Sequence, residues 1–246
     1  MTRLTVTEAS ATYEAAMRNV RPAGPGVCAR CHTFIDPSYA VCLTCSRQAN
    51  TLDVVTPITY SEHLGQLHTA LRNYKDGPVS VQRYAMVRLA AILWRFVATH
   101  EPCIARAAGV QRFDVVTSVP SGAPARDEER RNLRTIVGWC EPLGDRFSRV
   151  LRSTGSAVGR SYDEHRYVVT DRLDGRSVLL IDDTWASGGH AQSAGHALRR
   201  AGANAVALIA IGRHVQPGWR ITEDETSGER LAALPRRFDW ATCCVH

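Results

Sequence analysis

Runs of consecutive apolar residues alternate along the chain with segments of helical periodicity. Val178–Ile181 contains four apolar residues in a row, the pattern of a strand buried on both faces of a parallel sheet. Asn204–Ile211 and Phe113–Pro120 are predicted as two further strands, and residues 51–60 fit a fourth. Ala191–Ala201 places small and apolar side chains on one face of a helix. The pattern predicts an α/β fold in which a central, mostly parallel sheet is flanked by helices.

Helical patterns also occur outside this unit. Val81–Thr99 carries a wide apolar stripe and is predicted to end at Glu101-Pro102, because proline interrupts a helix. Further helical segments are predicted at Glu8–Val20, Glu62–Asn73, Leu133–Cys140 and Phe147–Leu151.

Composition narrows the class of protein. A chain of 246 residues with 44% hydrophobic and 22% charged residues is typical of a soluble globular protein with one substantial core and a small appendage. No apolar stretch approaches a membrane span, and the first ten residues lack an apolar signal segment. We therefore expect a cytoplasmic protein without membrane contact. The net charge of +6 permits binding of polyphosphates or nucleic acid and does not choose between them.

Candidate chemistry begins where the Val178–Ile181 strand ends. Asp182 and Asp183 follow it directly, and small, hydroxylated and glycine residues lead from there into the next helix. A loop that enters a helix N-terminus presents unpaired N–H groups and the positive end of the helix dipole, so it binds phosphate. Carboxylates suit sugar hydroxyls, which need acceptors. The simplest interpretation is a site for a 5-phosphate and a ribose diol; the alternative is an ordinary strand-to-helix turn.

This stretch resembles the 5-phosphoribosyl-1-diphosphate (PRPP) signature of type I phosphoribosyltransferases. Ala186 replaces a usual hydroxyl residue, and His190 stands where a threonine is common. The resemblance implies the type I phosphoribosyltransferase fold and PRPP binding. Asp182 and Asp183 would be catalytic, and the PRPP-binding residues would be Thr184, Trp185, Ala186, Ser187, Gly188, Gly189 and His190.

Two Cys-x-x-Cys pairs lie near the N-terminus, ten residues apart. Such pairs form knuckles that place four thiolates tetrahedrally around Zn²⁺, so we expect a closed, structural zinc site. Two redox-active pairs are the alternative interpretation. The predicted ligands are Cys28, Cys31, Cys42 and Cys45.

These knuckles, the segment Leu71–Gly77 and the later PRPP loop together resemble the ComF family of phosphoribosyltransferase-like proteins. The resemblance implies that Lys75, the single lysine of the chain, lies beside the diphosphate; the alternative is a solvated loop lysine. In type I enzymes the loop after the strand corresponding to Phe113–Pro120 also binds diphosphate. That implies a role for three residues of this chain, which are Ser121, Gly122 and Arg126.

Arginines cluster in and after this loop, at Arg126, Arg130, Arg131 and Arg134. They fit either a phosphate clamp or a solvated helix face. The tail Arg236–His246 contains two cysteines and a histidine, but no ligand spacing in it predicts a second metal site.

The resulting prediction is a phosphoribosyltransferase that moves 5-phosphoribosyl from PRPP to an unidentified nitrogen acceptor and releases diphosphate; a nucleobase-like acceptor is favoured. Mg²⁺ would accompany PRPP, and Zn²⁺ would be structural. The alternatives are a ComF-like protein associated with DNA uptake, which would bind single-stranded nucleic acid, and a non-catalytic PRPP or nucleotide sensor. A homodimer is also possible. The predicted organisation is an arm and linker over 1–26, a zinc module over 27–50 and the transferase domain over 51–246.

Overall fold

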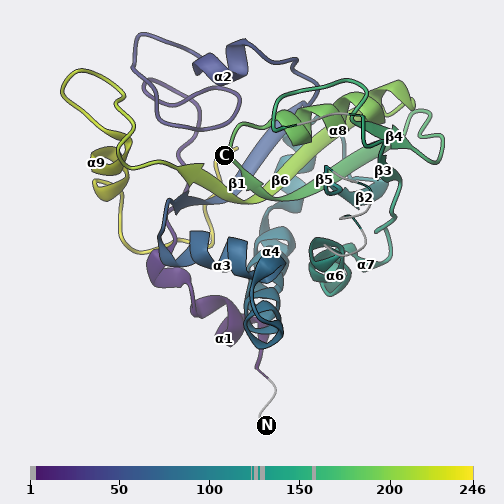
Figure 1. Ribbon diagram of the computed structural model, residues 1–246, viewed down its shortest axis with the longest axis horizontal. Coiled ribbons are helices and arrows are strands. Elements are labelled where there is room, and N and C mark those ends of the chain that lie inside the picture. Colours follow the sequence, from purple (N-terminus) through teal and green to yellow (C-terminus); the bar gives the residue numbers. More distant parts are fainter. Residues whose placement is uncertain (1–3, 123, 125–126, 128–130, 157–158, 246) are drawn as a thin grey trace.

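The computed structural model describes residues 4–122, 124, 127, 131–156 and 159–245. Four parallel strands form the sheet at its centre, in the order β1-β6-β5-β2 (Figure 1). Their bounds are Val54–Glu62 (β1), Val115–Ser118 (β2), Ser177–Trp185 (β5) and Ala205–Val215 (β6). All four predicted strands are thus present.

The strands are apolar because both faces of the sheet are covered. Leu180 of β5 pairs in register with Leu208 of β6, and neither side chain is exposed to solvent. On one face lie α3 (Gln66–Asp76), α4 (Val79–Ala107) and α6 (Asn132–Gly138), whereas α8 (Gly189–Arg200) covers the other face (Figure 1). The chain therefore has the predicted α/β fold, with a parallel sheet between helices.

Short elements complete the described structure. The helix α1 (Val6–Ala11) packs on α4, and β3 (Leu151–Ser153) pairs with β4 (Tyr167–Val169) as an antiparallel ribbon. The remaining short helices are η1 (Glu14–Ala16), α2 (Leu43–Ser46), α7 (Glu141–Gly144) and α9 (Ser227–Ala232). No helix among the described residues is both long enough and apolar enough to span a bilayer.

Several helix predictions are wrong. The run predicted as helical over Glu8–Val20 forms only α1 and η1, and the helix predicted from Glu62 begins at Gln66 because β1 extends to Glu62. The helix expected to end at Glu101-Pro102 continues to Ala107, because Pro102 removes a single backbone donor while the following turn buries Ile104 and Ala105 in the core. The segment Phe147–Leu151 is extended and not helical. Phe147 forms a parallel bridge with Val116, so this segment pairs along the β2 edge of the sheet.

The N-terminal arm contributes to the main core. The Met17 side chain is fully buried in the cluster formed by α3, α4 and the sheet, and Asn19 bridges Thr59 of β1. Cys28, Cys31 and Cys45 belong to the core cluster on the α8 face. The division into arm, module and domain at residues 26 and 50 stays a prediction.

The connections after β2 and β5 leave the sheet in opposite directions. The chain after β2 leads to α6 on one face, whereas the chain after β5 enters α8 on the other (Figure 1). In an open parallel sheet such a switch point forms a crevice at the carboxyl ends of the strands. The candidate site is therefore expected between the ends of β2 and β5.

Candidate functional site

A pocket of about 710 Å³ lies at this edge of the sheet. Its walls come from α3, from the loop after β2, from the junction of β5 with α8, and from His214 on β6. The structure brings most of the predicted site residues to it: Lys75, Ser121, Gly122, Asp182, Asp183, Thr184, Ala186, Ser187, Gly188, Gly189 and His190. Arg126 lies outside the described residues.

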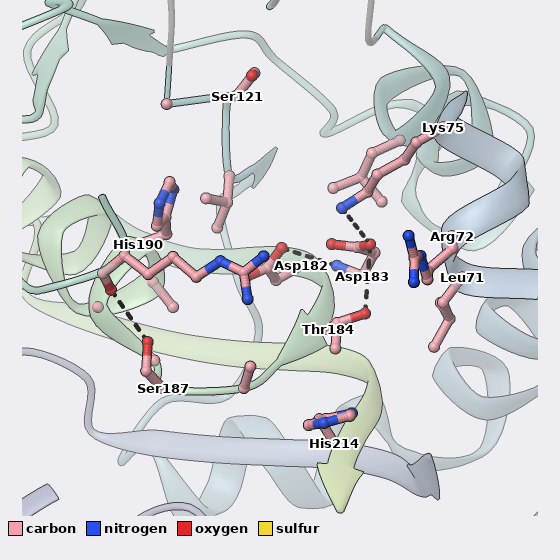
Figure 2. Close-up of a pocket in the computed structure, with 18 of the residues that line it drawn as sticks. Leu71, Arg72, Lys75, Ser121, Asp182, Asp183, Thr184, Ser187, His190 and His214 are labelled. Atoms are coloured by element: carbon pink, nitrogen blue, oxygen red, sulfur yellow. Dashed lines mark hydrogen bonds and ion pairs between the residues drawn. The ribbon is translucent and has the colours of Figure 1, made fainter. Parts of the chain in front are cut away.

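A lysine and two aspartates form the charged centre of the pocket. Lys75, in the last turn of α3, places its ammonium nitrogen 2.6 Å from Oδ2 of Asp183. Figure 2 shows the two side chains facing each other, with Asp182 on the side nearer α8. Burial raises the pKa of Asp183, but the charge and hydrogen bond of Lys75, together with hydrogen bonds from Asp182 and Tyr74, outweigh burial and the pKa is lowered. Burial and the neighbouring Asp183 charge raise the pKa of Asp182 well above its usual value. The pair therefore holds one carboxylate firmly ionised and a second that is more readily protonated.

The start of α8 is built for close approach of a ligand to the backbone. Gly188, its N-cap, has a φ of 81°, and no side chain caps the helix N-terminus. A Cβ at Gly188 would lie 2.2 Å from the ring of Trp185, so only glycine fits. The Trp185 ring itself is 2% exposed and packs in the core on the α8 face. Trp185 is thus the one described residue of the predicted PRPP-binding loop that does not line the pocket.

The segment before β4 lies over this helix end. The Ser187 hydroxyl donates to the carbonyl of Arg160 at 3.1 Å, and Nε2 of His190 is 3.3 Å from the carbonyl of Gly159. A Cβ at Gly189 would lie 2.2 Å from the same Arg160 carbonyl. Both carbonyl oxygens are acceptors and repel an anion. Binding of phosphate to the α8 N-terminus therefore requires this segment to move.

The loop after β2 is held by a buried carboxylate. Asp127 accepts from the backbone N–H of Ser121 at 3.0 Å and pairs with Arg134 and Arg149 at 3.0 and 2.6 Å. Arg134 is thus paired with Asp127 and does not line the pocket. Neither of the two roles expected for Arg134, a phosphate clamp or a solvated helix face, is favoured by this position. Arg130 lies outside the described residues, and Arg131 is exposed.

Three histidines that sequence reasoning missed also line the pocket and together form the histidine wall. His63 follows β1, His68 lies on α3 and His214 on β6, with ring centroids 4.9 to 5.5 Å apart. Nδ1 of His68 accepts the backbone proton of Leu64, so its Nε2 carries the ring proton and the neutral ring has no lone pair left for an ion. Burial, followed by the neighbouring histidines, lowers the pKa of His214 to about 4. The lowered pKa values of His68 and His214 favour neutral, hydrogen-bonding rings at these two positions. The sequence held one signal for this cluster. His63 and His214 lie at the carboxyl ends of two predicted strands, and those strands are parallel neighbours in the sheet.

The four predicted cysteine ligands converge on the far side of β6. Their sulfur atoms lie within 4.8 Å of one another, with 3.8 Å between those of Cys31 and Cys42. The backbone N–H groups of Cys42 and Cys45 point at the sulfurs of Cys28 and Cys42, at 3.2 and 3.4 Å. N–H donors of this kind favour thiolates. The donor set fits a metal ion such as zinc.

Arg213 connects this cluster to the pocket. The side chain is 5% exposed and lies on β6. Its Nε donates to the Cys31 carbonyl at 2.8 Å and Nη2 contacts the Cys31 sulfur at 3.4 Å, while Nη1 donates to the Trp185 carbonyl at 3.1 Å and to the His214 carbonyl at 2.7 Å. One buried guanidinium thus fixes the cysteine cluster, the end of β5 and the histidine wall relative to one another.

No model of a protein family matches the sequence, and no curated protein matches it. Among solved structures, the purine phosphoribosyltransferase from Pyrococcus horikoshii Ot3 is similar to this chain at 14% identity and a TM-score of 0.31. The similarity covers 55% of this chain and 95% of that one.

Replacement of Arg213 tests the connection between the cluster and the pocket. Arg213→Met leaves several buried carbonyl groups without a donor, so we expect the free energy of unfolding to fall by about 3 kcal/mol or more. Urea denaturation measures the change. Arg200→Met, on the exposed end of α8, removes the same charge and should change stability by less than about 0.5 kcal/mol. Equal stability of the two variants would contradict the connecting role.

The histidine wall predicts a pH dependence of stability. The pKa of folded His214, about 4, lies below the unfolded value of 6.5, so the folded state resists protonation. Its contribution to stability is complete above pH 6.5 and is lost as the pH falls towards 4. His214→Gln should therefore lose less stability than the native chain between pH 7 and pH 4.5, as measured by urea denaturation. Identical losses would show that His214 titrates normally.

Proposed function

We propose that the chain is a PRPP-binding phosphoribosyltransferase that transfers 5-phosphoribosyl to a nitrogen acceptor and releases diphosphate. The observation that carries the proposal is the convergence of Lys75, the Asp182-Asp183 pair and the uncapped α8 N-terminus on one pocket. The pocket offers a cation, two acceptors and a set of backbone donors. Those are the groups that a diphosphate, a ribose diol and a 5-phosphate require.

In this proposal the 5-phosphate binds the backbone N–H groups at Gly188–His190, once the segment at Gly159 and Arg160 moves. The ribose hydroxyls donate to Asp182 and Asp183. Lys75 lies next to Asp183 and is close enough to the diol to reach the diphosphate on the neighbouring anomeric carbon. The loop at Ser121 and Gly122 forms the facing wall (Figure 2).

Transfer then breaks the bond between the anomeric carbon and the diphosphate oxygen and forms a bond from that carbon to the acceptor nitrogen. The electron pair of the broken bond leaves on diphosphate, where Lys75 stabilises the growing negative charge. The carboxylates of Asp182 and Asp183 favour the positive charge that develops on the ribose. Diphosphate oxygens and these carboxylates are ligands that suit Mg²⁺, which would supply further charge neutralisation when bound. Positioning and electrostatics carry the catalysis, and no side-chain nucleophile is needed.

The histidine wall supports a nucleobase-like acceptor. Neutral imidazoles donate and accept hydrogen bonds without a net charge, as recognition of the edge of a planar heterocycle requires. His63, His68 and His214 all line the pocket.

The four cysteines would hold structural Zn²⁺, and the combination of cysteine module, Lys75 and PRPP loop is the one expected of a ComF-like protein. Binding of single-stranded nucleic acid and homodimer formation stay predictions.

Calorimetric titration with PRPP and Mg²⁺ at moderate salt tests the pocket. The native chain should bind saturably, and Asp182→Asn with Asp183→Asn should abolish binding because the diol loses its charged acceptors. Lys75→Ala should weaken binding about tenfold or more, the value of a lost charge-assisted contact. Asp171→Asn with Asp174→Asn makes the same charge change at exposed positions and should leave the affinity unchanged. If both double variants bound PRPP with equal affinity, Asp182 and Asp183 would not be the residues that bind the ribose diol.

Diphosphate release measured with a panel of nucleobases and amines separates the enzyme from the alternatives. Release that depends on one acceptor and is lost in the aspartate variant supports transfer. Tight PRPP binding without release from any acceptor favours a sensor. Absent PRPP binding together with salt-dependent binding of single-stranded DNA favours the nucleic-acid-associated protein.

A further inference from the structure

A histidine and two cysteines from distant parts of the chain meet beneath the C-terminal tail. His100 and Cys103 lie one turn apart on α4, and Cys243 belongs to the tail, 140 positions after Cys103. The donor atoms of the three side chains lie within 4.8 Å of one another. The tail alone shows no ligand spacing because two of the three groups come from α4.

The distances within this cluster are those of a tetrahedral metal site. The sulfurs of Cys103 and Cys243 are 3.5 Å apart, and the Cys103 sulfur is 3.8 Å from Nδ1 of His100. Zinc–sulfur bonds of about 2.3 Å and zinc–nitrogen bonds of about 2.0 Å give edges of about 3.8 Å and about 3.6 Å in a tetrahedron. The corresponding edge between Cys31 and Cys42 in the four-cysteine cluster is 3.8 Å.

The imidazole of His100 is oriented as a metal ligand. Its Nε2 lies 2.9 Å from the carbonyl oxygen of Trp240, and a carbonyl only accepts, so Nε2 carries the proton. In the neutral ring Nδ1 then holds the lone pair, and Nδ1 is the atom next to Cys103. A histidine ligand commonly donates its other N–H to a backbone carbonyl, which fixes the tautomer and the ring orientation.

The surroundings are largely buried, although Cys103 is partly accessible. His100 is 1% exposed and Cys243 is 4% exposed, and the Phe96 ring packs against His100 at 4.6 Å between centroids. The Cys103 thiol donates to the His100 carbonyl at 2.9 Å, and a metal ion would displace that proton. Thiolates and a neutral imidazole in such a setting favour Zn²⁺ over hard cations such as Mg²⁺.

We propose that His100, Cys103 and Cys243 form a second zinc site, separate from the four-cysteine cluster, that clips the C-terminal tail to α4. Three protein ligands leave a fourth position for water or an exogenous ligand. The tail that the site anchors also contacts the N-terminal arm, since the Asn19 amide donates to the Asp239 carbonyl at 2.8 Å. Arg95 stacks on the Trp240 ring at 4.1 Å. The zinc ion would therefore lock together the two ends of the described chain over the α4 face.

Metal analysis of the full chain tests the site. The native chain should carry about two zinc ions, and Cys103→Ala and Cys243→Ala should each carry about one. Cys140→Ala is the matched control, because Cys140 is also a buried cysteine that contacts α4 but lies outside the cluster, and it should keep about two. About one zinc ion in the native chain, with no loss in either variant, would overturn the proposal.

Two further measurements use the native chain. The first does not depend on a variant that folds, and the second distinguishes a metal site from a disulfide between Cys103 and Cys243. X-ray absorption at the zinc edge of the native chain should give an average of about three sulfur and about one nitrogen or oxygen ligand per ion; about four sulfurs would contradict the site. Denaturing mass spectrometry without reductant should show both thiols reduced. A mass about 2 Da low that Cys103→Ala restores would mean a disulfide between the two sulfurs instead.

Discussion

The structure depends on a buried positive charge, that of Arg213, near the carboxyl end of the inner strand β6. A guanidinium held at 5% exposure is tolerated only if its donors are satisfied and its charge is compensated. Arg213 meets both conditions by donating to carbonyls around the pocket and by contacting the Cys31 sulfur. Thiolates at the cysteine cluster would supply the negative charge, so the cluster would be an electrostatic partner of the pocket wall as well as a support for the N-terminal module.

The position of the pocket follows from the topology of the sheet. Parallel strands bring their carboxyl ends to one edge, and the opposite directions taken after β2 and β5 leave a crevice there. Asp182 and Asp183 occupy this edge because they directly follow the apolar part of β5, and α3 brings Lys75 to the same place from a distant part of the chain. The crevice thereby combines a cation, two carboxylates and a helix N-terminus without any residue that must act as a nucleophile.

The sequence predicts features that depend on local pattern and misses those that depend on tertiary contacts. Apolar runs located the strands, and fixed spacing located the four cysteines. Pro102 was expected to end its helix, but burial of the next turn outweighs one lost hydrogen bond. Trp185 was predicted to bind PRPP, but its ring lies in the core against Gly188. Two clusters join residues that are far apart in sequence, so no local spacing predicts them. These are the histidine wall and the cluster of His100, Cys103 and Cys243.

The most direct test of the proposed function is a crystal structure of the chain with PRPP and Mg²⁺. We expect the 5-phosphate on the backbone of Gly188–His190, the ribose diol on Asp182 and Asp183, and the diphosphate within reach of Lys75. The Gly159 and Arg160 carbonyls should move away from Ser187 and His190. PRPP bound elsewhere, or a ribose that does not contact either aspartate, would contradict the proposed function.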